Sequence, residues 1–174
     1  MSSSLRRGGA IKSIYVDTSV IVARYKPGDP LYNDSNALFQ REYRFVVSPL
    51  VLVELYSVFS RIRPYIRLPK PLKGVALNSL VRFVIDDCKL TVMYNLLIAR
   101  IREGACRVPL EYIYAMRLAE ALRLRALDLL HVAQASLLNG EVEALVTGDE
   151  ELLERRERIK ELTGLSVASP RELI

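Results

Sequence analysis

Four carboxylates stand at comparable places in this sequence, and together they indicate metal chemistry. Asp17 and Asp149 each follow a short apolar run of β-favouring residues, whereas Glu54 and Asp128 each interrupt an apolar helical pattern. Divalent cations such as Mg²⁺ and Mn²⁺ prefer oxygen ligands, and Mg²⁺ sites combine a few carboxylates with water and substrate phosphates. Four carboxylates cannot all ionise in one small space without a cation, because like charges raise one another's pKa. The pattern therefore predicts a divalent metal site if the fold brings these residues together.

The segment before Asp17 favours a buried strand that ends at this residue. Residues 14–16 are Ile, Tyr and Val, and Thr18 and Ser19 follow the acid. In an open parallel α/β sheet, ligands bind outside the carboxyl ends of the strands, so an Asp that closes the first strand is well placed for chemistry. Asp, Thr and Ser also favour helix N-caps, and a purely structural role for these residues is the alternative.

Glu54 lies in a helix that we expect Ser48 and Pro49 to begin, because a capping residue followed by proline is the favoured order. The apolar residues that recur at helical spacing in this helix are Leu50, Val53, Tyr56 or Ser57, and Phe59. A carboxylate that is buried on such a face without a partner is costly, so we expect Glu54 to face a cation, a proton or a metal. An exposed glutamate on the outer face of the helix is the alternative.

The rest of the chain alternates between strand and helix patterns. Beyond residues 14–16, the expected strands are residues 43–47, 89–94, 144–147 and 165–168. The expected helices are residues 19–25, 31–42, the helix that begins at Ser48, 75–88, 95–103, 109–124, 126–138 and 150–162. Asp128 therefore lies near the start of a helix, and Asp149 closely follows the fourth strand.

Length and composition fit one folded domain that spans residues 1–174. Of the 174 residues, 51% are hydrophobic and 26% are charged, which is typical of a globular protein. Residues 1–12 include basic residues but no apolar stretch before a cleavage site, so we expect a flexible basic tail rather than a signal peptide. No apolar run approaches the roughly 18 residues of a membrane helix. We therefore expect a cytoplasmic protein without membrane association.

The positive charge of the chain favours an anionic partner such as nucleic acid. The net charge is +5, and part of it lies in residues 61–74, a basic stretch that also contains Tyr65. Three prolines exclude a regular helix there and predict a loop or arm. The cations that would contact phosphates while the aromatic ring stacks on a base are Arg61, Arg63, Arg67, Lys70 and Lys73. A solvated linker is an equally supported alternative.

The two cysteines, Cys88 and Cys106, indicate neither a metal site nor a disulfide framework. They lack the spacing of metal ligands, and two cysteines are too few for a disulfide scaffold. We expect them to act as two small buried hydrophobic residues. A disulfide between them is the alternative, since intracellular disulfides occur in hyperthermophiles.

Four motifs in a fixed order make the sequence resemble the PIN domain family and, within it, the VapC-type toxin ribonucleases of toxin–antitoxin pairs. The motifs are YVDTSVIVA at residues 15–23, SPLVLVELYS at 48–57, LRALDLLHVAQA at 124–135 and LVTGDEELL at 145–153, with VASPREL near the end. Each motif is weak alone. The ordered set covers both ends of the chain and is specific.

The resemblance implies a fold and a site. The fold is a three-layer α/β/α arrangement with a small parallel sheet of about four to five strands, which agrees with the alternation of elements. The catalytic, metal-binding residues that it implies for Mg²⁺ or Mn²⁺ are Asp17, Glu54, Asp128 and Asp149. The hydroxyl residues that it implies in support are Thr18, Ser19 and Thr147. The only histidine, His131, lies where the family tolerates histidine without a catalytic role, so we expect it to be structural.

The resemblance also implies a reaction and partners. The reaction is cleavage of RNA phosphodiester bonds by metal-activated water, in an endoribonuclease that is the toxin of a VapBC-type pair. The implied partners are RNA, an antitoxin protein and a second copy of the chain in a homodimer. An RNA-processing or DNA-directed PIN nuclease without an antitoxin is one alternative. A catalytically silent dimeric binding module is the other.

Overall fold

The centre of the molecule is a parallel β-sheet. The computed structural model describes residues 12–69, 74–100, 107–138 and 140–174. The strands of the sheet are β1 (Ser13–Val16), β2 (Arg44–Val47), β3 (Thr91–Val92), β6 (Ala144–Val146) and β7 (Ser166–Ala168). These five strands lie in the order β3-β2-β1-β6-β7, and all neighbours are parallel. The predicted α/β class with a small parallel sheet is confirmed.

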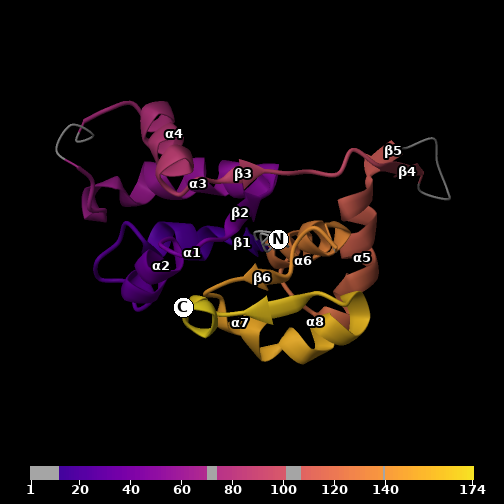
Figure 1. Ribbon diagram of the computed structural model, residues 1–174. Helices are drawn as coiled ribbons and strands as arrows, with labels where there is room; N and C mark the ends of the chain where they lie inside the picture. The colour runs from indigo at the N-terminus through magenta and orange to yellow at the C-terminus, as the bar shows by residue number, and fades with distance from the viewer. Residues whose placement is uncertain (1–11, 70–73, 101–106, 139) are drawn as a thin grey trace, which may run out of the picture.

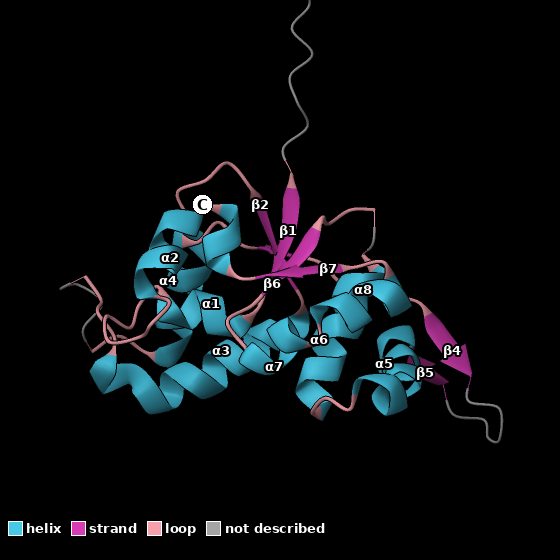
Figure 2. Cartoon of the chain, turned by 90° about the horizontal axis from the view of Figure 1, so that it is seen from below, coloured by secondary structure: helices cyan, strands magenta, loops and turns pink. Residues whose placement is uncertain are grey.

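Helices lie on both sides of this sheet, as Figure 1 and Figure 2 show. They are α1 (Thr18–Ala23), α2 (Tyr32–Leu38), α3 (Pro49–Ile62), α4 (Leu77–Asp87), α5 (Leu110–Leu122), α6 (Ala126–Leu137), α7 (Glu150–Glu154) and α8 (Arg156–Thr163). Figure 2 shows α1 to α4 on one side of the strands, and α5, α6 and α8 on the other. The three-layer arrangement is therefore also confirmed.

The inner strands are apolar after their first residues, because helices cover both of their faces. β1 has the sequence SIYV, β2 RFVV and β6 ALV, and the side chains of Tyr15, Val46 and Leu145 are fully buried. Continuous rather than alternating apolar runs are typical of such strands. Beyond β1, the N–H of Asp17 donates to the carbonyl of Val146 at 2.9 Å. The residues that follow β1 and β6 therefore meet at the carboxyl edge of the sheet.

The helix expected at residues 95–103 is absent from the described part of that segment. Ile98–Arg100 forms strand β4, which pairs antiparallel with β5 (Arg107–Pro109) in a separate small sheet beside α5 (Figure 1). The N–H of Leu97 donates to the side chain of Asn95 at 2.8 Å, just before β4 begins. A short apolar run shows no periodicity that would distinguish a helix from a strand. Here, pairing with β5 decides that residues 98–100 form a strand.

The buried face of α3 differs from the expected one. Val51, Leu55 and Phe59 are buried, whereas Val53 has 66% of its surface exposed and Tyr56 is also exposed. Phe59 is buried as expected, but Val51 and Leu55, which lie four residues apart on the same face of the helix, take the place of the other expected residues. The helix is apolar on more than one side, and its sequence alone does not select the side that faces the core.

Two segment boundaries also differ from the expected ones. The basic arm expected at residues 61–74 begins inside α3, which continues to Ile62 and is followed by a 3₁₀ turn at Arg63–Tyr65. The single helix expected at residues 150–162 is divided at Arg155 into α7 and α8. At the first place the helical part ends at Tyr65, and the described residues 66–69 have no regular structure, as expected for a loop. At the second place the sequence did not predict the break.

The tail and the cysteines lie only partly within the described residues. Residues 1–11 fall outside them, and the side chain of Lys12 pairs with Glu143 at 3.1 Å. Cys88 is buried as expected, and burial raises the pKa of its thiol to about 11, whereas Cys106 is outside the described residues. Within the described ranges, every helix is too short or too polar to cross a membrane.

Candidate metal centre

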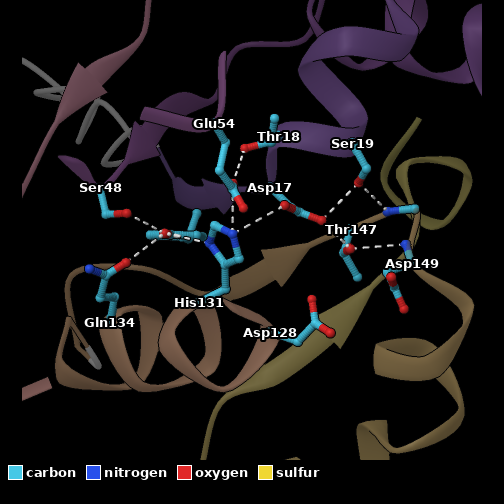
Figure 3. A network of polar contacts seen from close by, with 12 residues as sticks. Asp17, Thr18, Ser19, Ser48, Glu54, Asp128, His131, Gln134, Thr147 and Asp149 are labelled. Atoms are coloured by element: carbon cyan, nitrogen blue, oxygen red, sulfur yellow. Dashed lines mark hydrogen bonds and ion pairs between the residues drawn. The ribbon is translucent and has the colours of Figure 1, made fainter. Parts of the chain in front are cut away.

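The four predicted acids lie at one edge of the sheet, where β1 and β6 end (Figure 3). Asp17 directly follows β1, and Asp149 precedes α7. Glu54 lies in the first half of α3, and Asp128 lies in the first turn of α6. Parallel pairing places these four segments at a common edge, as the sequence predicted.

The carboxylate of Asp17 is held by two hydroxyl groups. Ser19 Oγ donates to Asp17 Oδ2 at 2.8 Å, and Thr147 Oγ1 donates to the same oxygen at 2.6 Å. Asp17 occupies the N-cap position of α1, yet its side chain makes no capping hydrogen bond. Helix capping therefore does not explain why an aspartate occupies this position. Its other oxygen, Oδ1, lies 3.7 Å from Nε2 of His131.

Asp149 caps a helix and also offers an oxygen to the site. Its Oδ1 accepts hydrogen bonds from the N–H groups of Glu151 at 2.8 Å and Leu152 at 3.3 Å, at the start of α7. Its own N–H donates to Thr147 Oγ1 at 3.0 Å. The second oxygen, Oδ2, accepts from Nη2 of Arg125 at 2.8 Å. One carboxylate thus serves both the helix and the site.

The remaining hydroxyl residues predicted as supports also contact the site. Thr18 Oγ1 donates to Glu54 Oε2, and the N–H of Gly148 donates to Ser19 Oγ at 3.0 Å. A Cβ at Gly148 would collide with the side chain of Leu31 and lie 3.5 Å from Ser19 Oγ. The small residue therefore lets the loop after β6 approach α1 closely enough to link the two parts of the site.

His131 lies inside the acidic cluster, a place that the sequence analysis did not assign to it. Its Nε2 is 2.9 Å from Glu54 Oε2 and 3.7 Å from Asp17 Oδ1, and the ring is buried. Ligand atoms of these three residues lie within 4.8 Å of one another. The signal in the sequence was its position three residues after Asp128, on the same face of the helix. A histidine on an apolar helical face fits a structural role equally well, so the signal was not decisive.

The charges of this cluster favour an ion pair in the metal-free chain. Burial lowers the pKa of His131, but the hydrogen bond to Glu54 and the charges of Asp17 and Glu54 outweigh burial, so the pKa is raised. Burial raises the pKa of Glu54, but the hydrogen bonds from His131 and Thr18 outweigh it, so this pKa is lowered. An imidazolium thus neutralises part of the acidic charge.

A buried hydroxyl network lies behind His131. Its Nδ1 is 3.1 Å from the hydroxyl of Tyr15, which is 2.7 Å from Ser48 Oγ and 3.4 Å from Gln134 Oε1. Burial raises the pKa of the Tyr15 phenol, so the hydroxyl stays neutral. A partner on the second ring nitrogen fixes the orientation of an imidazole, as it does for histidines that bind metals.

Asp128 and Asp149 are joined by an arginine. Nε of Arg125 donates to Asp128 Oδ2 at 2.9 Å, and Nη2 donates to Asp149 Oδ2 at 2.8 Å. Arg125 is the N-cap residue of α6, and 69% of its side chain is exposed. Burial raises the pKa of Asp128, and the charges of Asp149 and Asp17 act in the same direction, against the contact with Arg125. The four acids therefore form two pairs, each with its own cation.

The donor set fits a divalent cation. Two carboxylates and an imidazole within 4.8 Å of one another are compatible with one ion at ordinary bond lengths of about 2.0–2.2 Å. A neutral imidazole can bind a metal, whereas an imidazolium cannot, so metal binding at His131 would release a proton. Asp128 and Asp149 offer further oxygens at the same edge. The arrangement can hold a metal where parallel sheets commonly bind ligands.

The predicted nucleic-acid-binding arm is only partly described. The guanidinium groups of Arg61 and Arg63 donate to backbone carbonyls, so both side chains also hold the local chain. The ring of Tyr65 is 74% exposed. Lys70 and Lys73 lie outside the described residues. A role of this arm in binding nucleic acid stays a prediction.

Two solved structures are similar to this chain. VapBC2 from Rickettsia felis, in a crystal structure bound to a DNA fragment from its promoter, matches with a TM-score of 0.52 and 17% identity, over 90% of this chain and 98% of that one. VapC20 from Mycobacterium tuberculosis, a toxin that cleaves the sarcin–ricin loop, matches with a TM-score of 0.49 and 15% identity, over 81% of this chain and 93% of that one. At this identity the first match concerns the fold alone. Among curated proteins, no sequence matches the chain.

A family model matches most of the chain. The model is that of the PIN domain, and it matches residues 14–158. This span contains the four acids, His131 and the loop that carries Thr147. The match confirms the family that the four sequence motifs indicated. The chain belongs to the PIN domain family.

Proposed function

We propose that this chain is a metal-dependent endoribonuclease and that it is the toxin of a VapBC-type toxin–antitoxin pair. The observation that carries the proposal is the cluster of Asp17, Glu54 and His131, whose ligand atoms lie within 4.8 Å at the carboxyl edge of the sheet. Asp128 and Asp149 lie at the same edge. Membership of the PIN domain family supports a nuclease, since the cluster provides the acidic ligands that such chemistry needs.

The proposed mechanism uses Mg²⁺ or Mn²⁺, which lowers the pKa of a bound water and stabilises charge on the phosphate. The role of the protein in this mechanism would be to hold the metal ligands in position. Thr147 and Ser19 hold Asp17 from one side, and Thr18 holds Glu54 from the other. Ligands that are already oriented do not need to be ordered during the reaction. None of these side chains needs to act as the nucleophile.

The proposed substrate is RNA, and its phosphates are the chemical feature that the chain recognises. The net charge of +5 and the cations of residues 61–74 support binding to a polyanion. We infer that Arg61, Arg63 and Arg67 contact phosphates, so added salt should weaken RNA binding. This arm would supply affinity, while the acids supply the chemistry.

The proposed partners are an antitoxin protein and a second copy of the chain. The fold shared with VapBC2, a toxin–antitoxin complex, motivates the first of these partners. Copurification of a small protein encoded next to this chain would support the toxin role. A cytoplasmic location fits the proposed substrate. Light scattering of the purified protein would test the homodimer.

The first experiment is cleavage of labelled RNA and, in parallel, labelled DNA, with Mn²⁺, Mg²⁺ or EDTA. The variant Asp17→Asn removes a charge from the cluster, and Asp86→Asn removes one from an exposed position on α4 as a matched control. We expect RNA cleavage that needs the metal, survives Asp86→Asn and is lost in Asp17→Asn. Cleavage of DNA alone would favour the DNA-directed alternative. Metal binding without any cleavage would favour the silent binding module.

A further inference from the structure

Arg125 occupies the oxygen through which Asp149 would bind a metal, and it also bonds to one of the two oxygens of Asp128. Asp149 uses Oδ1 to cap α7, so Oδ2 is the oxygen that it can offer to a metal, and Nη2 of Arg125 bonds to that oxygen at 2.8 Å. Nε of the same guanidinium bonds to Asp128 Oδ2 at 2.9 Å. A divalent cation that uses both Oδ2 atoms would therefore have to take the place of the guanidinium.

The position of Arg125 allows this exchange. A guanidinium keeps its charge at any ordinary pH, so it must move rather than lose a proton when a cation arrives. Its side chain is 69% exposed, and exposed ion pairs are weak because water screens them. His131 in the other pair is buried and fixed by Tyr15, so it lacks this freedom. Arg125 is therefore the cation of the site that can swing away.

We propose that Arg125 is the counter-ion of Asp128 and Asp149 in the metal-free chain, that a divalent cation displaces it, and that the freed guanidinium then contacts a phosphate of the RNA. The inference rests on the proposed function. The backbone of Arg125 is anchored at the start of α6, so the displaced group stays beside the metal centre. A guanidinium binds phosphate through two parallel hydrogen bonds, as it binds carboxylates here.

This arrangement couples metal binding to RNA binding. The metal releases the guanidinium for the phosphate, and a phosphate that holds the guanidinium leaves the two carboxylates to the metal. Coupling between two ligands is reciprocal, so each should strengthen the binding of the other. A purely structural role for Arg125 predicts no such coupling.

The first test is a calorimetric titration of the metal-free protein with Mn²⁺, without RNA. Arg125→Gln removes the guanidinium, and Arg123→Gln is the matched control, because Arg123 is exposed and has no ion pair with any described residue. We expect Arg125→Gln to bind Mn²⁺ roughly threefold to tenfold more tightly than the control. The Mn²⁺ affinity of Arg125→Lys should lie between those of Arg125→Gln and the control, because lysine keeps the positive charge but cannot bond to both carboxylates as the planar guanidinium does. Equal or weaker binding by Arg125→Gln would overturn the proposal.

The second test measures the affinity for a cleavage-resistant RNA by fluorescence anisotropy, in proteins that keep all the proposed metal ligands, and gel electrophoresis confirms that the RNA stays intact. We expect Mn²⁺ to strengthen RNA binding, and Arg125→Gln to lose most of this gain while Arg123→Gln keeps it. A full gain in Arg125→Gln would show that the contact with phosphate is wrong.

The two failures can be told apart. If neither the wild-type chain nor any of the variants binds Mn²⁺, the proposed metal-dependent function fails together with the role of Arg125. If all of them bind Mn²⁺ equally and the wild-type chain cleaves RNA, the function stands and the role of Arg125 alone is wrong. Urea denaturation of each variant confirms that the compared proteins are folded.

Discussion

Two halves of the candidate metal centre balance acidic charge in different ways. The inner half consists of Asp17, Glu54 and His131, and the outer half consists of Asp128, Asp149 and Arg125. The cation of the inner half is 2% exposed and has a buried tyrosine behind it, whereas the side chain of the outer cation is 69% exposed. Each half therefore holds two carboxylates and one cation, but only the cation of the inner half is enclosed by the protein.

This difference indicates that burial decides whether a charge pair stabilises the fold or mainly serves ligand binding. Removing one member of a buried pair leaves the other charge without water, which is strongly destabilising. Removing one member of an exposed pair leaves a charge that water solvates. The inner half should therefore contribute to stability as well as to metal binding. In the outer half, Arg125 should affect ligand binding alone, whereas Asp149 also stabilises α7 as its N-cap.

The largest expected effect comes from His131→Phe, which removes the inner cation. Glu54 and Asp17 then face each other without a cation between them, so the free energy of unfolding of the metal-free chain should fall by about 2–4 kcal/mol. Mn²⁺ should restore part of this loss, because it supplies the missing charge. Urea denaturation with and without Mn²⁺ measures both effects. Arg125→Gln should leave the unfolding curve unchanged, and an equal loss in both variants would end the distinction between the halves.

The same pair predicts a pH dependence. The raised pKa of His131 in the folded chain exceeds its ordinary value of 6.5, so this residue stabilises the fold below pH 6.5 and loses that contribution as pH rises through the folded pKa. The free energy of unfolding of the metal-free chain should therefore fall above pH 6.5, by at most about 1.4 kcal/mol per pH unit. His131→Phe should abolish this slope. A slope that survives the substitution would assign it to another group.

Thr147→Val tests the link between the halves. The hydroxyl donates to Asp17 in the inner half and accepts from the N–H of Asp149 in the outer half, and the residue is fully buried. We expect a loss of about 1–2 kcal/mol in stability and roughly tenfold in Mn²⁺ affinity. Thr163→Val is the control, since Thr163 makes the same kinds of bond in α8, away from the site. Equal Mn²⁺ affinity in both variants would contradict the link.

The smallest expected effect comes from Tyr15→Phe, which removes the hydroxyl behind His131. We expect a loss of about 1 kcal/mol in stability and a few-fold loss in Mn²⁺ affinity. Tyr25→Phe is a matched control, because Tyr25 is also buried and its hydroxyl bonds to Asp87 outside the site. Both variants should lose stability, and only Tyr15→Phe should bind Mn²⁺ more weakly. Calorimetry on the two proteins checks this difference.

The places of the acids were predictable because they depend on strands with a clear pattern. Residues 14–16 and 144–146 are continuous apolar runs that end near Asp17 and Asp149, and parallel pairing brings such ends to one edge. The sequence analysis left a capping role open for Asp17, and the structure shows that its side chain does not cap α1. Main-chain architecture thus fixes where these two acids lie.

The features that were not predictable depend on side-chain choices or distant pairing. His131 lies on an apolar helical face whose partner across the site is Glu54, a residue 77 positions earlier, and no local pattern records that contact. Arg125 is exposed, so its contact with Asp149 follows from rotamer and reach rather than from burial. Strand β4 exists because β5 pairs with it, and three residues are too few to show a period.

The position of β6 has a consequence for the synthesis of this protein. β6 lies between β1 and β7 in the middle of the sheet, and the hydroxyl that holds Asp17 comes from Thr147, directly after β6. A ribosome makes the chain from its N-terminus, so a nascent chain of 143 residues contains Asp17, Glu54 and His131 but lacks the strand that completes the site. If the proposed ribonuclease function holds, a chain that is still being translated would therefore not cut the messenger RNA beside it, because its site is incomplete until β6 and Thr147 have been made.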